Sequence, residues 1–241
     1  MPFQLTLLPQ MRDSDPDGLI GLRGVMRNFQ NIHQWYMHRI HKGNDELPKA
    51  YGAAWIYTRY HVTVDEKIDH SSDIRLTAWM EPYRRPVLVT MDMLVEQHGR
   101  IAARGKIESC VFHLAGQHPM MLGEIDFPEN MPEEAPEEVP DYIGLGRNAD
   151  GMEERYLHTV RYADVDQNRH MANLRYIEMF QNAHNKAFWD RLEPRQMEIS
   201  FFSQCREGET LSVRSRVGEG SVALSAVHAD GRIAAAAAFT R

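Results

Sequence analysis

The chain has 241 residues, 43% of them hydrophobic and 25% charged, values typical of a globular protein. A net charge of −7 leaves no broad basic field for nucleic acid, and no apolar run approaches the ~20 residues of a membrane-spanning helix. Two cysteines are too few for a disulfide framework, and the N-terminus lacks the features of a signal peptide. We therefore expect a cytoplasmic protein that binds neither nucleic acid nor membrane.

The first predicted element is a helix at about 18–41, where apolar residues recur at steps of three and four. The period then falls toward two, which predicts strands at 54–64, 73–80, 86–97 and 100–114. The tetrapeptide at 97–100, Gln-His-Gly-Arg, is a hairpin-turn candidate between the last two strands.

A linker is predicted at 124–155, between an N-terminal half at 1–123 and a C-terminal half at 156–241. Its centre reads as an exposed segment because proline alternates there with acidic side chains. The acidic residues are Glu133, Glu134, Glu137, Glu138 and Asp141.

The second half repeats the pattern of the first. A helix is predicted at 170–192, ending before Pro194, and strands at 198–205, 210–217, 222–229 and 232–241, with a turn candidate at 228–231. Propensity alone favours a helix for the alanine run 234–238, but the matching segment of the first half favours a strand.

The two halves are related by an internal duplication. Aligning Asp13 with Asp164 brings six identities into a window of 21 residues, against roughly one or two expected by chance, and Gly-Arg-Ile-Ala-Ala occurs at both 99–103 and 231–235. A long helix followed by an antiparallel meander, present twice, is best explained by each sheet wrapping its own helix. The predicted class is α+β, and the pattern resembles two tandem hotdog folds.

The two copies differ at the residues that can do chemistry. Leu19 stands where the second copy has His170, and Asp17 stands where it has Asn168. Only the second copy therefore offers an imidazole that can exchange a proton near neutral pH.

The second copy carries the pattern D-x-D-x-N-x-H-x-x-N-x-x-Y, from Asp164 to Tyr176. This motif resembles that of the plant and bacterial acyl-acyl-carrier-protein (acyl-ACP) thioesterases, which carry it just before the helix of their second half. The resemblance extends to the strands around Arg59-Tyr60 and Ala78-Trp79. It implies hydrolysis of fatty acyl thioesters with no metal or organic cofactor.

The chemistry of thioester hydrolysis is consistent with roles for Asp166, Asn168 and His170 in catalysis. Thioester hydrolysis needs an activated water and a donor for the developing oxyanion. His170 can take the proton, Asp166 can orient the imidazole, and Asn168 can donate an amide N–H. Aspartate and asparagine before a helix are also ordinary capping residues, which is an equally good interpretation of Asp164 alone.

The family has a second motif, a strand that ends in Glu-Cys, and the matching residues here are Gln204 and Cys205. Gln204 is a departure, because an amide cannot act as a base. We include Gln204 in the site as a group that positions water. Cys205, which matches a cysteine once read as a nucleophile, is better explained as a buried strand residue.

The histidines at 33, 38 and 41 suggest a metal site, but their spacing does not place them on one helical face, so no metal is predicted. The first half, which lacks the catalytic set, is expected to provide the acyl pocket. An acyl-CoA thioesterase and a non-catalytic protein that binds acyl chains or ACP are the alternatives. Candidates for contact with the acidic ACP are Arg161, Arg169, Arg175 and Lys186. The sequence leaves open the acyl chain length and whether the protein is a homodimer.

Overall fold

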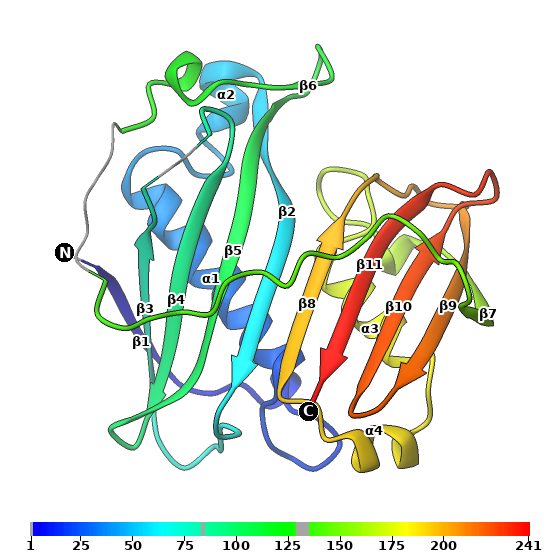
Figure 1. The fold of residues 1–241 in the computed structure, drawn as a ribbon. Helices are drawn as coiled ribbons and strands as arrows, with labels where there is room; N and C mark the ends of the chain where they lie inside the picture. Colours follow the sequence, from blue (N-terminus) through cyan, green and yellow to red (C-terminus); the bar gives the residue numbers. More distant parts are fainter. Residues whose placement is uncertain (1, 83–84, 129–134) are drawn as a thin grey trace. The chain divides into compact units, whose positions relative to one another are not determined.

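The computed structural model describes residues 2–82, 85–128 and 135–241 (Figure 1). The chain divides into two compact units, Met1–Asp141 (unit 1) and Tyr142–Arg241 (unit 2). Part of the predicted linker, including Glu133 and Glu134, lies outside the described residues. No helix among the described residues is both long and apolar enough to cross a membrane.

Unit 1 is an antiparallel sheet with the long helix α1 (Leu22–Arg39) against it (Figure 1). The helix buries Val25, Met26, Phe29 and Ile32 and contacts four strands. The strand order is β1-β3-β4-β5-β2, and the short β6 pairs with β5. The other elements are β1 (Phe3–Leu7), α2 (Leu47–Tyr51), β2 (Ala53–Val64), β3 (Ile74–Met80), β4 (Val89–Gln97), β5 (Arg100–His113) and β6 (His118–Pro119).

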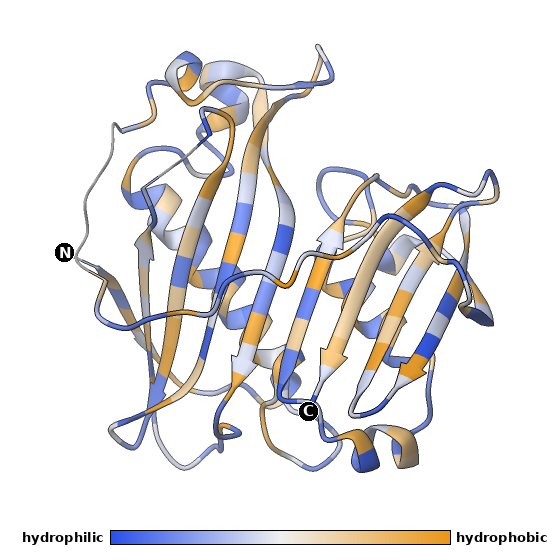
Figure 2. Cartoon of the chain, in the orientation of Figure 1, coloured by the Kyte–Doolittle hydropathy of each residue, from blue (hydrophilic) through white to orange (hydrophobic). Residues whose placement is uncertain are grey.

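Unit 2 contains a second antiparallel sheet, in the order β7-β9-β10-β11-β8. Apolar and hydrophilic residues alternate along β9, as expected for a strand with one buried face (Figure 2). The elements are β7 (Glu153–Thr159), α3 (Asn173–Gln181), α4 (Lys186–Leu192), β8 (Gln196–Phe201), β9 (Thr210–Gly218), β10 (Ser221–Val227) and β11 (Ile233–Thr240).

The two sheets have the same topology. Numbering the strands of each unit from one to five in chain order gives the order 1-3-4-5-2 in both. The α+β prediction is therefore confirmed, and the duplication seen in the sequence extends to strand pairing. The alanine run lies in β11, so the strand interpretation taken from the repeat is confirmed over helix propensity.

Three strands were missed by the sequence patterns: β1, β7 and the two-residue β6. β1 and β7 both precede the helices, and β7 begins inside the range predicted as linker. Each lies at the edge of its sheet and has no fully buried residue. The alternation of apolar and polar residues in β1 spans only five residues, and β7 shows no such alternation.

The second predicted helix is wrong as a single element, because the structure divides it into α3 and α4. Asn185 adopts an extended backbone, and its side chain accepts a hydrogen bond from the N–H of Phe188, so it begins a new helix as an N-cap. In the duplication the matching residue of α1 is Gln34, which lies within the uninterrupted helix. A shorter side chain that caps well explains the break.

Both hairpins predicted from the repeat are present. His98 and Gly99 have φ of 53° and 73° in a two-residue turn between β4 and β5. The turn between β10 and β11 is one residue longer, closed by the His228 N–H to Arg232 O bond, with Gly231 at φ 85°. The common Gly-Arg-Ile-Ala-Ala sequence therefore marks equivalent hairpins in the two units.

The segment before the unit boundary is anchored to the sheet of unit 1. Val139 is buried against Trp79 and Leu94, and the carboxylate of Asp141 lies 3.0 Å from the Lys106 ammonium. In unit 2 the buried carboxylate of Glu198 accepts the backbone N–H groups of Ile143 and Gly144. Each unit thus holds its own end of the connecting chain.

Candidate active site

Three of the four predicted catalytic residues, Asp166, Asn168 and His170, lie in one tight loop of unit 2 that ends at α3. An isolated β-bridge joins Val165 to Met171, and inside it the N–H of Asp166 donates to the carbonyl of His170 at 3.0 Å. The Asn168 N–H donates to Asp166 Oδ1 at 2.8 Å, which fixes the carboxylate. The structure therefore brings Asp166, Asn168 and His170 together as expected.

The same loop exists in unit 1. There the Asp15 N–H donates to Leu19 O at 2.8 Å and the Gly18 N–H to Asp15 O at 2.9 Å, and the latter bond is matched in unit 2 by Arg169 N–H to Asp166 O at 3.0 Å. Gly18 and Arg169 both have positive φ, 83° and 63°. The backbone is therefore duplicated, and only the side chains distinguish the two copies.

The segment to which each loop is hydrogen-bonded is also duplicated. Met171 N–H donates to Cys205 O at 2.8 Å, and Ile20 N–H donates to Ile68 O at 2.8 Å. This correspondence places Lys67 at the position of Gln204. Lys67 forms an ion pair with Asp17, the counterpart of Asn168. In unit 1 a salt bridge joins the side chains at these two positions, whereas in unit 2 both positions carry neutral amide side chains.

Asp164 has a structural role. Its carboxylate accepts the Arg161 N–H at 2.9 Å in a capping box at the short 3₁₀ turn before the loop. Its counterpart in unit 1, Asp13, is buried in an ion pair with Arg27 at 2.9 Å. The capping interpretation therefore accounts for Asp164.

His170 is half-buried, and its pKa lies below the ordinary value. Burial is the largest cause and lowers it, the charge of Asp166 raises it, Arg206 lowers it and Glu209 raises it. An imidazole with a lowered pKa is neutral at pH 7, the form that can accept a proton. The site thus contains a base in its active protonation state.

Cys205 is fully buried, and burial raises the pKa of its thiol to about 11. It shares a side-chain hydrogen bond with Tyr176 of α3, whose own pKa is raised by burial. A thiol in this environment is a poor nucleophile. Gln204 is exposed, and β8 ends at Phe201, so both residues lie in the loop after the strand. The predicted strand, which ran to residue 205, was too long at this end, and Cys205 is a buried loop residue.

Three further residues of unit 2 gather beside this loop and were missed by sequence reasoning. His228 lies with Nε2 2.8 Å from Ser203 Oγ and 3.8 Å from Cys205 Sγ, while Nδ1 is 3.6 Å from Glu209 Oε2. These residues belong to no motif that we recognised in the sequence. A comparison of the two copies could have indicated Glu209, because it stands where unit 1 has the uncharged Ser72.

Among the described residues, two groups of three side chains place potential metal ligands within 4.8 Å of one another. The first is Cys205, Glu209 and His228, and the second is His38, Asp45 and Glu46 on the surface. In the first group, Cys205 and Glu209 face different nitrogens of the His228 ring, at 3.8 Å and 3.6 Å. His33 is fully buried beside Trp55 and Tyr57, apart from the surface histidines.

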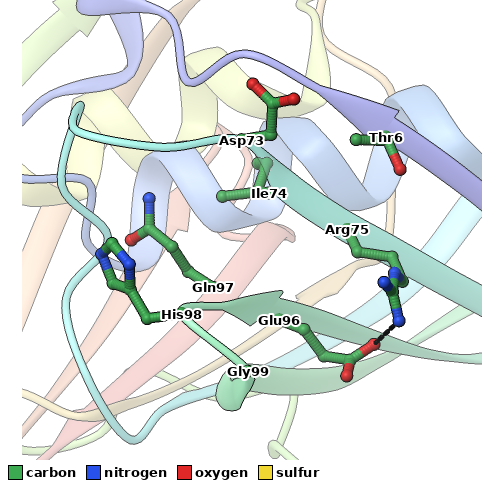
Figure 3. A pocket seen from close by; sticks show the side chains of 8 residues that line it. All are labelled: Thr6, Asp73, Ile74, Arg75, Glu96, Gln97, His98 and Gly99. Carbon is green, nitrogen blue, oxygen red and sulfur yellow. Dashed lines mark ion pairs between the residues drawn. The ribbon is translucent and has the colours of Figure 1, made fainter.

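Two surface cavities are lined largely by polar groups. One of about 170 Å³ in unit 1 lies between the ends of β3 and β4, and an Arg75–Glu96 ion pair at 4.0 Å crosses its edge (Figure 3). Another of about 370 Å³ in unit 2 is lined by Arg147, Arg214 and His228 together with the β10–β11 hairpin.

One comparison with known proteins matches the unit that contains this loop. Residues 147–237 match the family model described as the acyl-ACP thioesterase C-terminal domain. No match was found among curated protein sequences.

Similar solved structures span nearly the whole chain. An acyl-ACP thioesterase from Bacteroides thetaiotaomicron has a TM-score of 0.81 at 16% identity, covering 99% of this chain and 97% of that one. A 12:0-ACP thioesterase from Umbellularia californica has a TM-score of 0.77 at 19% identity, covering 99% and 96%. A putative oleoyl thioesterase from Lactobacillus plantarum has a TM-score of 0.76 at 12% identity, covering 99% and 95%.

The structures establish the hotdog-type fold over the whole chain, and the family model covers the unit that contains the Asp166–His170 loop. Residues 147–237 therefore belong to the acyl-ACP thioesterase C-terminal domain family, and the protein is a thioester hydrolase.

Proposed function

We propose that this enzyme hydrolyses fatty acyl-ACP to free fatty acid and ACP, using a water activated in unit 2. The observation that carries the proposal is the duplicated loop. One copy keeps the backbone but has Leu19 and an Asp17–Lys67 ion pair, while the other has His170, Asn168 and Gln204 on the same backbone. A shared structural role would not require this difference.

The reaction can be written with these groups. His170 removes a proton from water as the water oxygen bonds to the thioester carbon, and Asp166 supports the imidazolium that forms. The tetrahedral oxyanion then collapses, the C–S bond breaks, and the imidazolium returns its proton to the leaving sulfur. The products are a fatty acid and the carrier thiol.

Asn168 is assigned to the oxyanion. Its side chain is exposed on the loop, while its backbone N–H is occupied by Asp166, so the amide side chain is presented to substrate. The start of α3 contributes further N–H groups at the same end of the unit. Gln204 positions the water, because its amide can donate and accept hydrogen bonds but cannot take a proton.

The carrier is the finer part of the proposal. ACP is acidic and needs basic residues on its partner. Arg175 is paired with Glu178 and Lys186 with Asp190, both at 2.6 Å on their own helices, which leaves Arg161 and Arg169 beside the catalytic loop as the better candidates. We also propose that the acyl chain is held by unit 1, which lacks the catalytic set.

A hydrolysis assay tests the proposal directly. Acyl-ACP and acyl-CoA of matched chain length are compared, with release of free thiol as the readout. A higher kcat/KM for acyl-ACP supports the assignment, and a higher value for acyl-CoA makes the enzyme an acyl-CoA thioesterase. Binding of acyl-ACP with no release of thiol would make the chain a non-catalytic acyl-binding protein.

A further inference from the structure

Glu209 lies among chemically active side chains, in the turn that leads into β9. Its carboxylate, the Cys205 thiol and the His228 ring lie within 4.8 Å of one another. Its backbone is fixed on both sides, since Glu209 O accepts the Val160 N–H at 2.9 Å and Glu209 N–H donates to Arg206 O at 3.1 Å. The turn is therefore held in place before any substrate binds.

The Glu209 carboxylate faces a chain of two further groups. The Ser203 hydroxyl lies 2.8 Å from Nε2 of His228, and the opposite ring nitrogen lies 3.6 Å from Glu209 Oε2. If Ser203 donates to Nε2, the ring carries its proton on Nδ1 and points it at the carboxylate. With Ser203 as the donor, the Nδ1 proton of His228 faces the Glu209 carboxylate across 3.6 Å.

Unit 1 provides an internal control for this arrangement. There Gln97, the last residue of β4, clasps the corresponding turn by donating to the carbonyls of Asp69 and Ser72, both at 3.1 Å. His228 follows β10 at the equivalent end of its strand. At these two positions unit 1 has the neutral residues Gln97 and Ser72, although its turn also carries an exposed His98–Asp69 pair at 3.2 Å. A histidine and a glutamate at the positions of 228 and 209 are therefore found in unit 2 and not in unit 1.

The cluster is connected to the catalytic loop. The residue after His170, Met171, bonds to the carbonyl of Cys205, and Tyr176 of α3 bonds to the Cys205 side chain. The position that the family motif assigns to a glutamate is occupied here by Gln204, so the loop after β8 lacks a carboxylate there. Glu209 supplies one five residues later.

We propose that Glu209 is a positioning carboxylate of the catalytic centre: held by the Ser203–His228 pair, it directs its negative charge toward His170 and stabilises the imidazolium formed when water is deprotonated. The inference rests on the proposed function of His170 as the base. No additional bond is made or broken, since the proton still passes from water to His170 and then to sulfur.

The charges facing His170 give this proposal a measurable sign. Asp166 and Glu209 raise its pKa, while burial and Arg206 lower it. Glu209 itself faces His228, Cys205, Tyr176 and Arg232. Removing the charge of Glu209 should lower the pKa of His170, and removing the charge of Arg206 should raise it.

The first experiment compares Glu209→Gln, Arg206→Gln and Glu207→Gln. We expect Glu209→Gln to lower kcat by about tenfold, less than the ~100-fold expected for loss of the base, and to move the acid limb of kcat/KM to lower pH. Arg206→Gln should move the limb to higher pH. Glu207 is exposed on the same turn, so Glu207→Gln is the matched control and should change neither.

A second experiment tests the anchoring by His228. His228→Leu should shift the acid limb in the same direction as Glu209→Gln, and the double variant should be no worse than the more impaired single variant, because both remove one coupled unit. Thermal unfolding identifies any variant that fails to fold. Independent, additive effects would overturn the anchoring.

A third readout requires no turnover. Titration of the His170 ring by NMR in the substrate-free enzyme should give a lower pKa in Glu209→Gln than in wild type and an unchanged pKa in Glu207→Gln. Equal pKa values in all three proteins would overturn the proposal. If the shift is found but no variant hydrolyses a thioester, the coupling is supported and the proposed function fails.

Discussion

Lys67 and Asp17 form an ion pair in unit 1 at the positions that Gln204 and Asn168 occupy in unit 2. Introducing an imidazole beside this ion pair does not reproduce the catalytic set, because Asp17 offers no amide donor. We therefore expect Leu19→His to restore no thioester hydrolysis when added to His170→Ala. Recovery of wild-type kcat in that double variant would show that the two loops are chemically equivalent.

The catalytic loop makes the second prediction. His170→Ala and Asp166→Asn should each reduce kcat by about a hundredfold or more, the usual contribution of a general acid–base group. Asn168→Ala should cost a similar factor, by analogy with the roughly 2.7–4 kcal/mol measured for loss of one oxyanion donor. Pre-steady-state hydrolysis of a single acyl thioester separates these losses from changes in substrate affinity.

Gln204→Ala should reduce kcat less than any of these changes, and Cys205→Ser should retain most activity because the thiol is buried with a raised pKa. If a folded Cys205→Ser protein lost hydrolysis while His170→Ala kept it, a covalent mechanism would be required instead.

The third prediction concerns acid stability. Burial lowers the pKa of His33 to about 3, below the unfolded value of about 6.5. Between these values the unfolded chain binds more protons, so the free energy of unfolding falls as the pH drops through this window, with a slope of at most about 1.4 kcal/mol per pH unit. His33→Gln should reduce that slope in urea titrations between pH 6 and pH 4.

The control for this effect is His118→Gln, at an exposed histidine of the same unit. It should leave the pH dependence of unfolding unchanged. Equal slopes for wild type and His33→Gln would show that the folded state opens enough to protonate His33.

The fourth prediction concerns the buried Lys106. Its ammonium lies 3.5 Å from Asp92 and also pairs with Glu81, and burial followed by the charge of Glu81 raises the pKa of Asp92 to about 7. Lys106→Met leaves these carboxylates without their cation and should lower the free energy of unfolding by about 3–5 kcal/mol. Adding Asp92→Leu should recover part of that loss. Chemical denaturation of the single and double variants measures both steps.

Much of the architecture could be predicted because the sequence contains the same structural pattern twice. The repeat identified the β11 strand against the helix propensity of its alanines, and it marked the hairpins at Gly99 and Gly231. It also hid the break between α3 and α4, because an alignment with an unbroken helix gives no weight to the capping strength of Asn185. Local capping geometry decided that element.

The proximity of the candidate site residues could be predicted where a contiguous motif carries them. Asp166, Asn168 and His170 lie within five positions, so their spacing implies their proximity. Glu209 and His228 are 19 residues apart, and strand pairing between β9 and β10 brings them together. The register between two paired strands decides which polar side chains meet. The spacing of residues along the sequence does not reveal that register.

The loop bonds that recur in both units are main-chain bonds, from Asp15 to Leu19 and from Asp166 to His170. Leu19 and His170 therefore lie on the same loop backbone. The backbone conformation of the loop does not depend on which of these two side chains it carries. New side chains can therefore be sampled at positions 168 and 170 while the main-chain bonds that hold the loop are kept.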